Sequence, residues 1–354
     1  EYYDIQGQYR LTELTVDENG DPTLDNNQLL GVGTYLEHAR NRLESNVYSI
    51  NHTGEYKLKN NEIKWGIGYQ RETITDKLKE WEMRDSAGYS LPHTGILVNV
   101  FSSVKANNEI KSNRFSGYLQ DRLLMNSELG LFILNAGIRA SYWDFNEEFI
   151  VSPRVALHFV PERNENLIFR LATGVYYQAP FYKEFQQVMN TPSKSEVVLN
   201  RNIRSPKSIH VVLGNDYNFV ANTSPFRFTT ELYYKHLTDI IPYTINNVKI
   251  RYSGENEGSG YITGVDMRLY GEFVKGATSW VSLSLMKTEQ KVDGHKTPLP
   301  TDQRYNISVF FQDYFPGYER LKMNLKGHLS QGLPFSAPNK GLNCSMRLTA
   351  EISG

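Results

Sequence analysis

The sequence has almost no cysteine and no surplus of charge of either sign. A single cysteine, Cys344, stands among 354 residues, so no intrachain disulfide can form. The net charge of −1 removes the electrostatic basis for binding nucleic acid, which needs a basic surplus or a basic stripe. Stability must therefore come from strand pairing and packing, and no nucleic-acid partner is expected.

Long hydrophobic runs are missing as well. No run approaches the roughly 18 apolar residues that a membrane helix needs, and the mean hydropathy is −0.49. This absence does not exclude a transmembrane barrel, because its wall alternates lipid-facing apolar residues with lumen-facing polar residues and scores as hydrophilic. No signal peptide opens the chain at Glu1, which fits either a removed leader or an interior piece of a longer chain.

Motifs of the common enzyme classes are also missing. The sequence has no G-x-S-x-G, P-loop or H-E-x-x-H pattern, so nucleophilic, phosphoryl-transfer and zinc chemistry have no basis. Its eight histidines are scattered. We interpret a single histidine such as His158 or His328 as a solvated lumen residue rather than a metal ligand. We expect no enzymatic activity, no cofactor and no resident metal.

One segment partly matches a calcium-binding loop. Asp17, Asn19 and Asp21 have the oxygen spacing that starts such a loop. Pro22 replaces the turn glycine, and Gln28 stands where a bidentate glutamate is needed. We therefore interpret this segment as an ordinary acidic surface loop.

What the sequence does contain is aromatic residues spread along the whole chain, at 12%, and apolar residues that alternate with polar ones. Alternation with a period of two indicates strands that lie between two different media. We expect the apolar set to face lipid and the polar set to face a lumen. One example is Leu321, Met323 and Leu325, alternating with Lys322, Asn324 and Lys326.

These patterns predict an all-β fold, an antiparallel transmembrane β-barrel that occupies residues 1–354. Many of the strands reach the roughly 9–11 residues that cross a bilayer when tilted. The expected strands are 2–12, 45–59, 63–84, 111–126, 132–144, 148–160, 167–178, 207–220, 226–239, 259–275, 278–292, 303–315, 319–331 and 343–353.

The connections alternate in length, as expected for short periplasmic turns and longer extracellular loops. Short turns are predicted near 60–61, 126–130, 162–166, 221–225, 275–276 and 316–317. Long loops are predicted at 85–110, 179–206, 240–258 and 293–302, with a short exception at 145–147. A soluble sandwich or propeller would also alternate, but a propeller repeats every 40–50 residues or so, and no such repeat is present.

Several segments resemble TonB-dependent outer-membrane receptors. The family's "SPR … R … Y-x-x-P" passage is matched by Ser152-Pro153-Arg154, Phe169-Arg170 and Tyr176-Tyr177-Gln178-Ala179-Pro180. Its "E-x-Y-Y-K … G-Y-x-x-G-x-D" strand pair is matched by 231–235 and 260–266. Segments at 240–243, 271–274, 279–283 and 299–304 are most similar to Bacteroidetes-type members.

This resemblance implies a 22-stranded barrel in the Gram-negative outer membrane, closed by an N-terminal plug domain and energised by TonB. Neither a plug domain nor a TonB box is found in this chain. The expected solute is scarce, such as an iron-siderophore chelate or haem, with glycan or peptide import as an alternative. A passive or structural barrel without energised transport is the second function class.

The resemblance also predicts that the chain is an incomplete barrel. After residues 334–339 the family continues with a strand similar to "Y-R-R-x-D-I-G", whereas this chain departs from it and stops. A shifted reading frame or a gene interruption near residue 342 would explain the departure. A genuine variant would explain it too, because residues 346–352 still alternate.

Two sets of candidate functional residues follow. Arginine on a lipid face near the midplane would cost about 2–4 kcal/mol, so arginines that alternate with apolar residues are placed in the lumen, where they pair internally, contact the plug or attract an anionic solute. The lumen candidates are Arg139, Arg154, Arg170, Arg227, Asp266, Arg268 and Arg304. Loops carry recognition. The solute-contact candidates, which could equally belong to an interfacial girdle, are Tyr176, Tyr177, Gln178, Phe181 and Tyr182.

Overall fold

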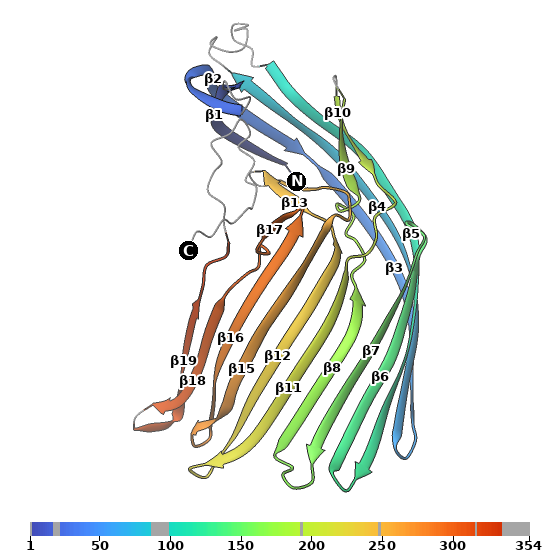
Figure 1. The fold of residues 1–354 in the computed structure, drawn as a ribbon, viewed down its shortest axis with the longest axis vertical. Helices are drawn as coiled ribbons and strands as arrows, with labels where there is room; N and C mark the ends of the chain where they lie inside the picture. The colour runs from blue at the N-terminus through green and yellow to red at the C-terminus, as the bar shows by residue number, and fades with distance from the viewer. Residues whose placement is uncertain are drawn as a thin grey trace.

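The structure is a computed structural model, and it describes residues 2–16, 22–85, 99–191, 194–246, 249–315 and 317–334. The described residues form strands joined by turns and loops, and 17 strands belong to one sheet. The sheet is strongly curved, and its long strands run side by side at a common tilt (Figure 1). No helix among the described residues is long and apolar enough to cross a membrane.

The strands fall into two groups by their place in the fold. The wall of the sheet is formed by β1 (Tyr2–Val16), β2 (Pro22–Arg40), β3 (Arg42–Lys57), β4 (Asn61–Asp85), β5 (Asn99–Ser127), β6 (Gly130–Trp143), β7 (Glu148–Pro161), β8 (Leu167–Tyr177), β11 (Lys207–Ala221), β12 (Ser224–Ile240), β15 (Gly258–Val274), β16 (Ala277–Val292), β18 (Tyr305–Phe315) and β19 (Tyr318–Ser330). Short strands lie within the loops: β9 (Gln186–Thr191), β10 (Lys194–Leu199), β13 (Tyr243–Asn246), β14 (Lys249–Tyr252) and β17 (His295–Thr297).

Apart from β2 and β3, wall strands that follow one another in the chain pair in antiparallel fashion. Strands β2 and β3 both lie along the same partner, β4, with a break at Asn41. Strand β11 pairs with β8 across the loop at 178–206, and β15 pairs with β12 across the loop at 241–257. Strand β1 pairs with β2, and β19 pairs with β18. The described sheet is not closed between β1 and β19.

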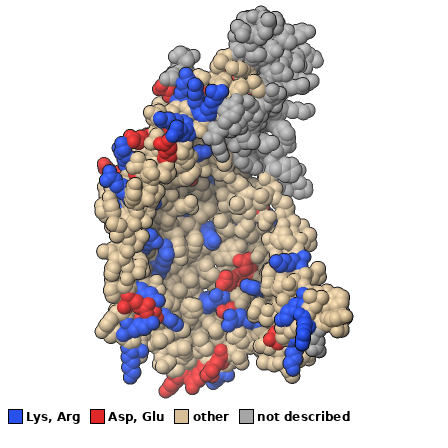
Figure 2. All heavy atoms as spheres, turned by 180° about the vertical axis from the view of Figure 1, so that it is seen from behind, with Lys and Arg blue, Asp and Glu red and all other residues tan. Residues whose placement is uncertain are grey.

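The two faces of the sheet differ in chemistry, as the alternation predicts. One face carries large apolar side chains that are exposed, including Phe169, Leu213 and Leu232 at 42%, 51% and 47%. The other face carries the charged and polar residues between them, and these line the hollowed side of the sheet (Figure 2). We call these the outer face and the inner face. An exposed apolar outer face fits contact with lipid.

Strands β4 and β5 are much longer than the others, with 25 and 29 residues. At about 3.3 Å per residue they extend well beyond the length needed to cross a bilayer. They form a tall wall at the end of the sheet where the long loops emerge (Figure 1). The hairpin of β9 and β10 adds to this wall, because Ser195 and Glu196 pair in parallel with Val104 and Lys105 of β5.

The structure corrects the sequence analysis in three places. Residues 22–40 form β2, although no strand was expected there; the loop proposed for 17–28 therefore ends before Pro22, and Gln28 lies in the strand. The long loop expected at 85–110 is mostly strand, since β5 begins at Asn99. The loops at 179–206, 240–258 and 293–302 contain short hairpin strands. The strand expected at 343–353 lies outside the described residues.

Candidate functional site

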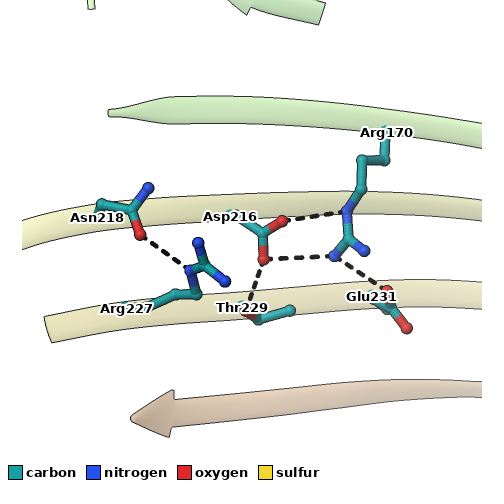
Figure 3. Close-up of polar contacts among 6 residues, drawn as sticks. All are labelled: Arg170, Asp216, Asn218, Arg227, Thr229 and Glu231. Atoms are coloured by element: carbon teal, nitrogen blue, oxygen red, sulfur yellow. Dashed lines mark hydrogen bonds and ion pairs between the residues drawn. The ribbon is translucent and has the colours of Figure 1, made fainter. Parts of the chain in front are cut away.

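Two bands of charged residues lie on the inner face, and the first is a closed ion-pair network. Arg170 on β8 reaches across β11 (Figure 3). Its Nη2 lies 3.0 Å from Glu231 Oε1 on β12, and its Nε lies 3.3 Å from Asp216 Oδ2 on β11. Asp216 also accepts a hydrogen bond of 2.6 Å from the Thr229 hydroxyl. We call these four residues the lower band.

A glycine makes this long reach possible. Gly214 stands directly between Arg170 and Glu231 in the strand register. A Cβ at this position would lie 3.2 Å from Nε and 3.3 Å from Cζ of Arg170, which is tighter than ordinary packing. The missing side chain therefore lets the guanidinium lie flat over β11 and join carboxylates on two strands.

The other lumen candidates on this side of the sheet also have partners. Arg227 Nε donates to Asn218 at 2.9 Å, and the Arg268 guanidinium lies 5.2 Å from the centre of the Trp280 ring. Arg304 follows a loop rather than lying in a strand, and its Nε is 2.8 Å from the buried Asp302 carboxylate. Asp266 is the register partner of Glu231 and therefore shares the inner face. Arg227, Asp266 and Arg268 thus lie on the inner face, while a role in plug contact or solute binding stays a prediction.

A second band lies higher on the inner face and contains basic and aromatic side chains. Arg154, Gly174, His210 and Lys235 are register partners in one row across β7, β8, β11 and β12. The Tyr176 ring lies 4.4 Å from the Arg154 guanidinium and 4.4 Å from the His210 ring. We call Arg154, Tyr176, His210 and Lys235 the upper band.

Half of this band can be predicted from the sequence. Arg154 and Tyr176 were candidates, but His210 and Lys235 were not, although both lie on the inner face of strands that the alternation predicted. Their joint position depends on register, which the sequence does not show. Arg139 lies on the same face, two strand positions from this row, and makes no ion pair within the described residues.

The five solute-contact candidates do not form one surface. Tyr177 follows Tyr176 in β8 and therefore lies on the outer face. Gln178 leaves the strand, and its N–H donates to the Pro206 carbonyl at 3.0 Å. Phe181 is 50% exposed and packs edge-to-face on Tyr182, with the ring centres 4.4 Å apart.

Tyr182 belongs to an aromatic cluster that the sequence analysis did not foresee. The cluster is formed by Trp143, Phe145, Phe185, Ile203 and Ile241, together with Ile110 of the tall wall. Phe185 is fully buried, and its ring lies 5.0 Å from Phe145 and 5.3 Å from Trp143. The members come from β5, the end of β6 and three different loops, so burial joins the loops into one unit. We call this unit the loop cluster.

Polar contacts attach the loops to each other. Glu148 accepts hydrogen bonds from the Ser205 N–H at 2.9 Å and from its hydroxyl. The Asn146 side chain donates to the Ile203 carbonyl at 2.9 Å. The Asn200 side chain donates to the Gly254 carbonyl at 2.8 Å, which links the 178–206 and 241–257 loops.

Two more contacts fix the loops to the inner face of the tall wall. Gln186 donates to the buried Asp76 carboxylate on β4 at 2.5 Å, and Arg251 forms an ion pair with Glu80 on the same strand. Tyr69, Phe115, Tyr142 and Phe149 form a row of aromatic side chains on the outer face of β4 to β7, where a membrane interface is expected. Asp76 lies seven residues beyond Tyr69 along β4 and is therefore outside the membrane-spanning part of the strand. Burial raises the pKa of the Asp76 carboxyl above its ordinary value. The loops therefore lean inward over the hollow of the sheet.

A family model for the TonB-dependent receptor β-barrel matches residues 2–339. The chain belongs to the TonB-dependent receptor family. It is therefore a β-barrel portion of a receptor of the Gram-negative outer membrane, and the family consists of receptors and transporters rather than enzymes. A sequence comparison with curated proteins gave no match.

Solved structures show the same fold at low sequence identity. The siderophore receptor PirA from Pseudomonas aeruginosa is 12% identical, with a TM-score of 0.52, over 93% of this chain and 62% of that one. The siderophore receptor PirA from Acinetobacter baumannii is 14% identical, with a TM-score of 0.53, over 92% of this chain and 50% of that one. This TonB-dependent receptor chain thus spans between half and two thirds of their length.

No group of three or more histidine, cysteine, aspartate or glutamate side chains that could hold a metal ion occurs in the part of the chain that the structure describes. The inner face instead offers guanidinium, ammonium, imidazole and phenol groups. Such groups bind a solute by charge, hydrogen bonding and stacking, without a change of covalent bonds.

Proposed function

We propose that this receptor barrel takes up a scarce solute across the outer membrane with energy delivered by TonB. The observation that carries the proposal is the loop cluster, which holds three loops together over the inner face directly beyond the upper band. A solute that enters from outside must pass beside this cluster to reach the inner face. Tyr176, at the end of β8, stands at that passage and is the proposed point of first contact inside the barrel.

The proposed solute class is an iron chelate of the siderophore or haem type. Two solved structures of similar fold are described as siderophore receptors, which supports this class over glycan or peptide import. The proposed partners are the lipid of the outer membrane, TonB, a plug domain and the solute, with no nucleic acid.

Uptake measurements test the proposal. A strain that lacks this receptor is complemented with the full-length receptor, and growth is measured on single iron, glycan and peptide sources with and without TonB. We expect growth on at least one source to need both the receptor and TonB. Growth that needs the receptor but is unchanged without TonB would instead favour the alternative, a passive barrel.

A Tyr176→Ala variant locates the contact. Loss of the ring removes stacking that contributes about 1 kcal/mol, so we expect the half-saturating concentration for uptake to rise several-fold while the amount of assembled receptor stays the same. Tyr177→Ala, on the outer face of the same strand, is the matched control and should leave uptake unchanged.

A further inference from the structure

The two bands of the inner face differ in how their charges are balanced. In the lower band, Arg170 is neutralised by Asp216 and Glu231 at ion-pair distances. In the upper band, neither Arg154 nor Lys235 makes an ion pair with any residue that the structure describes. Along β8, β11 and β12 the inner face therefore changes from self-paired charge in the lower band to unpaired positive charge in the upper band.

The positions around the upper band contain no carboxylate that could neutralise it. Its neighbours on the inner face include Ser152, Ala156, Ala172, Ser208, Val212, Tyr233, Leu237 and Ile262. The nearest carboxylates along β12 are Glu231 and Asp239, each four residues from Lys235. Arg170 already pairs with Glu231, and Asp239 accepts a hydrogen bond of 3.1 Å from the Thr238 hydroxyl, so neither forms an ion pair with Lys235. Arg139 adds a further cation on the neighbouring strand β6. Positive charge thus accumulates over a row that crosses four strands.

The arrangement of side chains in this row is suited to binding an anionic group. Gly174 stands between Arg154 and His210, and a Cβ there would lie 3.0 Å from Arg154 Cγ and 3.1 Å from Tyr176 Cε2. Its missing side chain lets the guanidinium and the phenol ring lie close together. A guanidinium held flat against a ring keeps its N–H donors directed to the side, where a planar anionic group can accept them.

We propose that the upper band is an anion-binding site that selects solutes carrying delocalised negative charge, such as catecholate or carboxylate groups, on their way past the loop cluster. The assignment rests on the proposed uptake function and narrows its solute class. Arg154 binds the anionic oxygens in a bidentate manner, Lys235 supplies a second positive charge, and Tyr176 with His210 offers an aromatic surface against which a planar ring stacks.

Binding of solute pairs that differ chiefly in charge tests the proposal. The probes are the net-negative tris-catecholate and the neutral tris-hydroxamate chelates of Fe³⁺, a succinylated and an unmodified tripeptide, and an oligosaccharide with and without uronate. Calorimetry with the full-length receptor in detergent gives each Kd. We expect the anionic member of at least one pair to bind more tightly, with an affinity that falls as salt rises.

Neutralising variants assign the effect to residues. Arg154→Gln and Lys235→Gln are each expected to weaken binding of the anionic probe about tenfold, since a charge-assisted hydrogen bond contributes on that order. Arg163→Gln in the β7–β8 turn and Lys275→Gln in the β15–β16 turn are the controls and should leave Kd unchanged. Assembly of each variant is checked by its heat-modifiable mobility on gels.

The outcomes separate this inference from the proposed function. If the neutral members bind as well as the anionic ones, if no anionic probe binds, or if the turn variants weaken binding as much as Arg154→Gln does, the anion site is wrong. TonB-dependent growth on a neutral solute would then leave the uptake function intact. If growth never depends on TonB, the uptake function fails, while charge-selective binding that is lost in Arg154→Gln would still support the site.

Discussion

Replacing Arg170 tests whether the lower band stabilises the wall. Methionine at this position keeps most of the side-chain volume and removes the charge, so Asp216 and Glu231 lose their shared cation. The side chains of Arg170, Asp216 and Glu231 are 29%, 15% and 36% exposed, so the contacts lie between a surface pair and a buried pair.

The expected cost follows from this partial burial. Exposed ion pairs contribute about 0.2–1 kcal/mol each, whereas removing one partner of a buried pair costs about 3–5 kcal/mol. Arg170→Met removes two ion pairs of intermediate exposure, but Asp216 keeps its hydrogen bond from Thr229. We therefore expect the variant to lower the free energy of unfolding by about 2–3 kcal/mol. The larger part should arise from Asp216, because it is the least exposed of the three.

Urea unfolding of the full-length receptor in detergent measures this cost, with heat-modifiable mobility as the readout. Arg163→Met in the exposed β7–β8 turn is the matched control. Asp216→Asn should lower the free energy of unfolding of the wild-type receptor. In the Arg170→Met background the same change should lower it by at least about 1 kcal/mol less, because the ion pair is already absent. If Arg170→Met lies within about 0.5 kcal/mol of the control, or if the two changes are additive, the network does not stabilise the wall.

Three further outcomes are expected. Met267→Arg places charge on the lipid face and should cost about 2–4 kcal/mol and reduce assembled receptor, while Arg268→Ala on the inner face should assemble normally; equal yields would contradict the face assignment. Phe185→Ala should loosen the loop cluster by about 3–5 kcal/mol and speed proteolysis within 178–206 without changing barrel assembly, and unchanged cleavage would argue against the cluster. Cysteine at Leu321 should be shielded from a water-soluble maleimide by detergent, whereas cysteine at Lys322 should react; the reverse pattern would invert the faces of β19.

The faces of the wall could be predicted from sequence because a strand has a period of two. Arg170, Arg227 and Arg268 were placed in the lumen by counting positions from apolar neighbours, and the register pairs agree. The same counting failed at residues 22–40, where Asn, Gly and Leu fall in no clear alternation. Pairing with β1 and β4 on either side makes this segment a strand, and such pairing is tertiary information.

The loop cluster could not be predicted for a different reason. Phe185, Ile203 and Ile241 lie in loops, and the apolar residues around them follow no period of two. They are buried only because the loops meet at the inner face of β4 and β5, whose exceptional length was itself underestimated. Contacts between residues far apart in the chain leave no local signal.

Alternation alone also leaves the register of the wall unspecified, because a slip of two residues keeps every side chain on its face. If β11 moved by two residues against β8, Val212 or Asp216 would replace Gly214 opposite Arg170. A side chain there would stop the guanidinium from crossing β11 and would separate it from Glu231. The same slip would place Ala172 or Tyr176 opposite His210 in place of Gly174. The side chains of the upper band would then no longer lie in one row. Charged residues and glycines on the inner face therefore favour the one register in which the charges of the lower band pair with one another and the upper band stays positive.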